Sequence, residues 1–151
     1  METSRGRIKA VSISKERGTQ KYNVQEIELK VNFGIEGDAH GGDWHRQISL
    51  LAEESIEKMK AKGADVKAGD FAENITTEGI NLYTLSLGSK LKLGDNAEVE
   101  ISQFGKKCHK DCEILKQFGD CVMPREGIFA KVTKPGRIKP GDKIEVIKPN
   151  D

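Results

Sequence analysis

The sequence predicts a mostly β protein, an antiparallel β-barrel with one or two short inserted helices. Three observations support this fold class. Short apolar runs with period-two alternation recur along the chain and give about seven or eight strands. Few segments have helical periodicity. Strands and helices do not alternate regularly, which disfavours a doubly wound parallel sheet.

The chain length indicates a single domain. It has 151 residues and a mass of 16.7 kDa, enough to bury a core without disulfides or metal. We find no repeat, no low-complexity tract and no shift in composition that would mark a boundary. We therefore predict one domain over residues 1–151.

The first half of the chain contains three predicted strands: Gly6–Ser14, Val24–Val31 and Gln47–Leu51. In the first, Ile8, Ala10 and Ile13 fall near one side. Residues 32–43, between the second and third, hold four glycines and predict a loop.

One helix is predicted over Ala52–Lys62. Ile56 and Met59 are apolar with a spacing of three, and Gly63 ends the helix. Acidic residues lead and basic residues follow, which matches the helix dipole. We interpret the charged side as a solvated face without a function. Lys110–Phe118 is a candidate for a second, short helix.

The second half contains the remaining strands. The alternation on both sides of residues 94–96 predicts a hairpin, and Pro135–Gly136 predicts a turn. The strand segments are Asn74–Thr77, Gly88–Asp95, Ala97–Ile101, Ile128–Thr133 and Lys143–Ile147.

The charge balance excludes some classes of function. With 25 basic and 24 acidic residues the formal net charge is +1, which argues against a nucleic-acid binder that depends on overall positive charge. No apolar run reaches the roughly 18 residues of a transmembrane helix, and residues 1–5 lead into no apolar segment typical of a signal peptide. We expect a cytoplasmic protein that binds neither nucleic acid nor membrane.

The glycine-rich loop Gly34–Arg46 is the first candidate site. It contains Asp38, His40 and the only tryptophan. Glycines allow close backbone approach to a ligand, and amide groups in such loops bind anions. A long surface turn explains the composition equally well. The loop has neither the Gly-Lys-Ser/Thr of a phosphate-binding loop nor a dinucleotide fingerprint.

The cysteine cluster is the second candidate. Cys108, His109, Cys112 and Cys121 lie close in the sequence, and Lys106, Lys107 and Lys110 surround the first thiol. Nearby positive charge favours the thiolate, which is the nucleophile and the metal ligand. For Cys108 we favour such a role, whereas for Cys121 we favour a small buried apolar side chain. A closed tetrahedral zinc site is an alternative, although the spacing differs from the usual Cys-x-x-Cys pairs.

A third candidate is Arg125, before Gly127 at the start of a predicted strand. An arginine there can hold a phosphate or carboxylate with two hydrogen bonds. An exposed ion pair with Glu126 explains it equally well.

Taken in order, these segments resemble the MOSC domain, named for the C-terminal domain of molybdenum cofactor sulfurase. The resemblance covers about Gly6 to Ile147. It is carried by Gly34–His40, Arg46–Leu51, Gly69–Thr76, Gly79–Leu82, Leu87–Gly88, Cys108, Arg125–Val132 and Gly136–Asp142. Two features depart from the family: Lys107 stands where many members have proline, and Cys112 and Cys121 are extra thiols.

The resemblance implies a β-barrel that binds molybdenum cofactor or handles sulfur for it. It implies Cys108 as the molybdenum ligand or sulfur carrier, on the same rim as the loop. The cofactor would meet Asp38, His40, Arg46, Asn74, Arg125 and Gly127, with the amide of Asn74 able to bind a pterin edge.

Three functions remain open at this point. The first is a cofactor-binding or sulfur-carrier protein, whose partner would be the cofactor or a protein that handles it. The second is a molybdenum-cofactor-dependent oxidoreductase of N-hydroxylated substrates, and the third is a structural zinc protein. Whether the chain is an enzyme stays undecided, and no pyridoxal-phosphate domain is expected.

Overall fold

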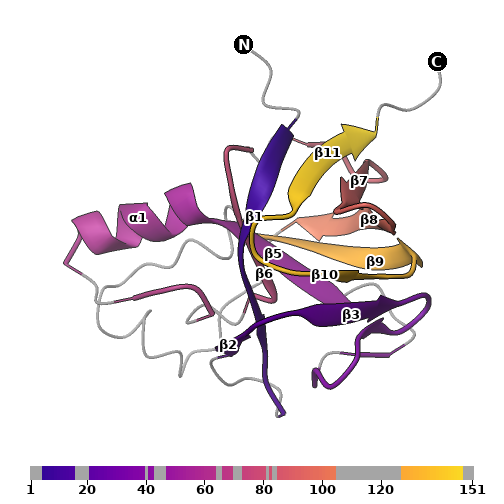
Figure 1. Ribbon diagram of the computed structural model, residues 1–151. Coiled ribbons are helices and arrows are strands. Elements are labelled where there is room, and N and C mark those ends of the chain that lie inside the picture. The colour runs from indigo at the N-terminus through magenta and orange to yellow at the C-terminus, as the bar shows by residue number, and fades with distance from the viewer. Residues whose placement is uncertain are drawn as a thin grey trace.

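The computed structural model is centred on a closed barrel of seven strands (Figure 1). The structure describes residues 5–15, 21–39, 41–42, 47–63, 66–69, 73–80, 82, 85–104 and 127–147. Each barrel strand pairs with the next, and β1 closes the barrel by pairing with β11. In pairing order the strands are β11 (Lys143–Ile147), β7 (Lys90–Leu93), β8 (Ala97–Phe104), β9 (Ile128–Lys134), β5 (Ile48–Ala52), β6 (Ile75–Glu78) and β1 (Arg5–Ile13). The predicted fold class is confirmed.

Four short strands lie outside the barrel circuit. β2 (Tyr22–Val24) pairs with β1, and β10 (Gly136–Ile138), β3 (Ile27–Lys30) and β4 (Gly34–Ile35) form a small antiparallel sheet. The segment predicted as one strand, Val24–Val31, is therefore split. Its first residue ends β2, which pairs with β1, and most of the rest forms β3 in the second sheet.

The predicted turn at Pro135–Gly136 is also shorter than expected, since Gly136 already begins β10. A Cβ at Gly136 would lie 2.8 Å from the backbone nitrogen of Ala97. Glycine is needed here because the two backbones approach closely.

One barrel pair, β5 with β6, is parallel. Parallel neighbours need a long crossover connection, usually a helix. Here residues 53–74 supply it and include α1 (Glu53–Ala61), which contacts both strands. In Figure 1 this helix lies to one side of the barrel.

The helix follows the sequence prediction closely. Ile56 and Met59 are buried, and Gly63 follows the last turn with φ of 96°. Lys60 pairs with Glu57 at 3.2 Å and lies 3.9 Å from Glu53. It is the one helix within the described residues, and none there is long and apolar enough to span a membrane.

A bulge in β1 sets which side chains face the core. Ile8 pairs with Thr77 and Ala10 with Thr76, so Lys9 is an extra residue on this strand. An extra residue reverses the alternation. Ile8 and Val11 both belong to the barrel core as a result, whereas Ala10, which we predicted beside Ile8, does not.

Candidate functional site

The carboxyl end of β1 carries buried polar residues where a core strand would carry apolar ones. Val11 and Ile13 face the core, so Ser12 and Ser14 face the outside of the barrel. Both serines are nevertheless buried, at 0% and 2% exposure, because other segments cover them. Each serine belongs to a separate hydrogen-bonded cluster.

The Asp38 cluster consists of Ser14, Lys21 and Asp38. Nζ of Lys21 lies 2.8 Å from Oδ1 of Asp38 and donates to Oγ of Ser14 at 3.1 Å. The backbone N–H of Ser14 also donates to Oδ1 of Asp38, at 3.0 Å. The side chains of Lys21 and Asp38 are both fully buried.

A buried ion pair holds its surroundings tightly, because either charge left alone would be costly. Asp38 lies in the glycine-rich loop, and the N–H of the next residue, Ala39, donates to the carbonyl of Ser14 at 2.8 Å. The Asp38 cluster therefore fixes the base of the loop against β1 and β2.

Several described amide groups of the loop also bond within the protein. Asp38 donates to the carbonyl of Ile35, Gly41 to that of Asp38, and Gly42 to that of Phe33. These N–H groups stabilise the loop's own turns. An anion at this loop would therefore depend on other donors.

The Asn74 cluster consists of Ser12, Asn23, Ser49 and Asn74. The amide of Asn74 donates to the carbonyl of Ser12 at 3.1 Å, and its Oδ1 accepts from the N–H of Ser49 at 2.9 Å. Nδ2 of Asn23 donates to Oγ of Ser12 at 2.7 Å. Asn74 thus joins β1 to β5 just before β6 begins, and its own side chain is fully buried within the protein.

The segment 66–69 covers both clusters. Gly69 accepts a hydrogen bond from the N–H of Lys21 at 2.9 Å, and Ala68 accepts one from Asn23 at 3.0 Å. Gly69 has φ of 96°, and a Cβ there would collide with the carbonyl oxygen of Lys21. Only glycine fits this position without movement.

The sequence prediction missed Lys21 and the two serines. A lysine between a turn and a strand carries no signal of burial. A signal did exist for the serines, because the large apolar residues of β1 fall at positions 8, 11 and 13. This interrupted alternation indicates a bulge, and the serines then share a face.

Three of the predicted site residues lie in the described part. Asp38 and Asn74 are buried in the two clusters, and Gly127 is buried immediately before β9. His40, Arg46, Cys108 and Arg125 lie outside the described residues, as do Cys112 and Cys121. The expected shared rim of Cys108 and the loop stays a prediction. Among the described residues, no group of three His, Cys, Asp or Glu side chains could hold a metal ion.

Comparison with known proteins gives one family and several solved structures. The family model described as MOSC domain matches residues 36–145. The YUAD protein from Bacillus subtilis superposes with a TM-score of 0.80 at 18% identity, covering 97% of both chains. YiiM from Geobacillus stearothermophilus has a TM-score of 0.72 at 21% identity, covering 95% of this chain and 75% of its own.

YiiM from Escherichia coli has a TM-score of 0.68 at 19% identity, covering 97% of this chain and 71% of its own. At these identities the likeness concerns the fold. A comparison with curated proteins gives no match.

Proposed function

This chain belongs to the MOSC domain family, and from that premise we propose that it binds molybdenum cofactor or carries sulfur for it through the thiolate of Cys108. The supporting observation is the family match, which spans most of the loop together with Asn74, Cys108 and Arg125. The family is associated with molybdenum cofactor sulfurase, and this association is what the proposal extends to the present chain.

The described residues fit this role as a scaffold. The side chains of Asp38 and Asn74 form hydrogen bonds inside the protein. We therefore assign them to positioning the loop and the neighbouring strands, and not to contact with the cofactor. The Asp38 cluster anchors the loop immediately before His40. A rigid support of this kind is what a precise binding site requires.

The contacts with the cofactor are assigned to residues of matching chemistry. A thiolate suits a soft metal centre, so Cys108 would hold molybdenum or a transferable sulfur. Arg46 and Arg125 would bind the cofactor's phosphate, and His40 would also contact the cofactor. When bound, the cofactor would supply the redox chemistry of molybdenum. The partner would be the cofactor itself or a protein that delivers or receives it.

The test is the metal and pterin content of protein made in a host that synthesises the cofactor. We expect molybdenum and pterin in the parent chain and their loss in Cys108→Ser, because a hydroxyl cannot replace a thiolate toward a soft metal. Cys112→Ser is the matched control and should keep both.

Other outcomes would redirect the assignment. Loss of molybdenum in Cys112→Ser alone would move the ligand to that residue. Stoichiometric zinc, with unfolding of both variants, would replace the proposal by a structural zinc site. Turnover of an N-hydroxylated substrate by the loaded protein would make the chain an enzyme.

A further inference from the structure

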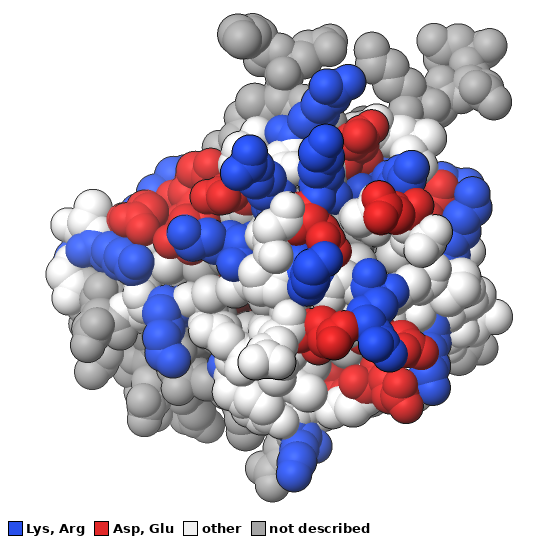
Figure 2. Space-filling view, viewed as in Figure 1, with Lys and Arg blue, Asp and Glu red and all other residues white. Residues whose placement is uncertain are grey.

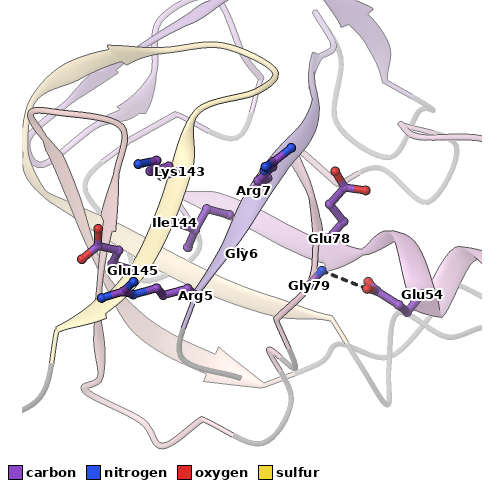
Figure 3. A pocket seen from close by; sticks show the side chains of 9 residues that line it. All are labelled: Arg5, Gly6, Arg7, Glu54, Glu78, Gly79, Lys143, Ile144 and Glu145. Atoms are coloured by element: carbon purple, nitrogen blue, oxygen red, sulfur yellow. Dashed lines mark hydrogen bonds between the residues drawn. The ribbon is translucent and has the colours of Figure 1, made fainter. Parts of the chain in front are cut away.

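An open cleft lies at the amino end of β1, away from the two polar clusters. Its volume is about 490 Å³, which lies in the range of about 300–1,000 Å³ typical of sites for small ligands. Figure 3 shows the side chains that line it. Its charged residues are Arg5, Arg7, Lys143, Glu54, Glu78 and Glu145.

In the registers of the described strands, charged residues that face each other carry opposite signs in all pairs but one. Opposite charges in such positions stabilise a sheet, and like charges destabilise it. The facing pairs of opposite sign are Arg5–Glu145, Glu145–Lys92, Lys92–Glu98, Glu98–Lys134, Lys90–Glu100, Glu100–Lys131, Arg7–Glu78 and Glu28–Arg137.

One facing pair in these registers breaks the rule: Arg7 on β1 lies directly opposite Lys143 on β11. Neither forms an ion pair with any described residue. In Figure 3 their cationic groups point away from each other, as repulsion requires. The fold therefore places two cations that form no ion pair opposite each other where they line the cleft.

The basic and acidic residues of the cleft lie on different elements, except that Glu145 of β11 faces Arg5 and so lies among the basic residues. Arg5, Arg7 and Lys143, on β1 and β11, form what we term the basic wall. Glu54 on α1 and Glu78 on β6 form the acidic wall. Glu54 is held in place, because its Oε2 accepts the N–H of Gly79 at 2.9 Å (Figure 3). On the face shown in Figure 2, basic and acidic side chains gather together over β1 and β11.

This arrangement discriminates between kinds of ligand. A simple anion would be attracted by the basic wall and repelled by the acidic wall. A simple cation would meet the opposite fields. A molecule that carries one charge of each sign can satisfy both walls at once, and it would also relieve the repulsion between Arg7 and Lys143.

We propose that the cleft binds a small zwitterion, an amino acid or a short peptide, with its carboxylate on the basic wall and its ammonium group on the acidic wall. The proposal is independent of Cys108 and of molybdenum cofactor. It also gives a role to Glu54, on a helix face that the sequence alone indicates to be merely solvated.

The test is a titration of the full chain with 4-aminobutyrate, in which NMR monitors the amide signals of Gly6 and Gly79. Butyrate and butylamine each keep one of the two charged groups and the same carbon chain. We expect saturable shifts with 4-aminobutyrate. Butyrate and butylamine should each bind at least about tenfold more weakly, since each lacks one of the two charged contacts.

Variants locate the site. Arg7→Gln and Glu78→Gln should each weaken binding of 4-aminobutyrate by about tenfold. Lys9→Gln is the matched control, because Lys9 is exposed on the same strand but does not line the cleft, and it should bind like the parent. Should Arg7→Gln fail to fold, Lys143→Gln tests the same wall.

Three results would overturn the proposal. Butyrate or inorganic phosphate binding as tightly as 4-aminobutyrate would indicate a plain anion site. The absence of saturable shifts with any probe would leave the cleft without a ligand of this class. An equal loss in Lys9→Gln would show that general surface charge, and not the cleft, governs binding.

Discussion

Replacing Lys21 with methionine tests whether the buried ion pair of the Asp38 cluster holds the glycine-rich loop. Methionine keeps the length of the side chain and removes the ammonium group that lies 2.8 Å from Oδ1 of Asp38. The carboxylate of Asp38 keeps the N–H of Ser14 but loses its buried counter-charge.

The expected loss is large because both side chains are fully buried. Removing one partner of such a pair costs about 3–5 kcal/mol in the free energy of unfolding. For a chain of this length each kcal/mol lowers the melting temperature by about 2–4 °C, so the midpoint should fall by roughly 6–20 °C.

The assay is urea unfolding of the parent and the variant, with Lys30→Met as matched control. Lys30 lies 3.4 Å from Glu36, but its side chain is 48% exposed, so its loss should change stability by less than about 1 kcal/mol. The double variant Lys21→Met/Asp38→Asn should recover much of the loss, because no buried charge remains. Equal losses in Lys21→Met and Lys30→Met would refute the reasoning.

Two smaller predictions concern β6 and α1. The hydroxyl of Thr77 is buried with no hydrogen-bond partner, so Thr77→Val should raise the free energy of unfolding by about 1 kcal/mol and shift the urea midpoint upward. Thr76→Val loses the hydrogen bond from Oγ1 of Thr76 to Glu73 at 2.9 Å, so it should lower the midpoint. A lower midpoint in Thr77→Val would contradict the assignment. Burial, and then a hydrogen bond with Glu57, raises the pKa of Glu53 above its ordinary value of 4.5, so its ionisation opposes folding and stability falls as the pH rises through the folded-state pKa. In Glu53→Gln that fall should be smaller when unfolding is measured across this pH range, and an unchanged slope would disprove the effect.

Local pattern was enough to predict most strands of this fold. The last strand is observed over the predicted residues Lys143–Ile147, and β7 and β8 flank the predicted turn at residues 94–96. In both cases each residue's neighbours along the chain determine which face it takes, so alternation alone carries the information.

Pairing between distant strands could not be predicted in the same way. The parallel pair β5–β6 depends on where the crossover returns the chain, and the split between β2 and β3 depends on a second sheet. Short apolar runs have the same composition whichever strand they pair with. The sequence therefore predicts a barrel without predicting the order of its strands.

The site shows the same division. The family resemblance pointed to Asp38 and Asn74 as ligands of a cofactor. Their burial depends on partners that are distant in sequence: the side chain of Asp38 bonds to Lys21, 17 residues away, and that of Asn74 to Ser49, 25 residues away. Polar residues in a loop look alike in sequence whether they face a ligand or each other.

The bulge at Lys9 explains how one strand supports two different polar regions. Before the bulge, Arg5 and Arg7 face outward and Ile8 faces the core. With unbroken alternation, residues of the same parity as Ile8 would face inward, and Ser12 and Ser14 would enter an apolar core without partners. The extra residue turns them to the outside, where the loop and the segment 66–69 cover them. The bulge therefore lets the same barrel wall present open, charged side chains at one end and a sealed hydrogen-bonded anchor at the other.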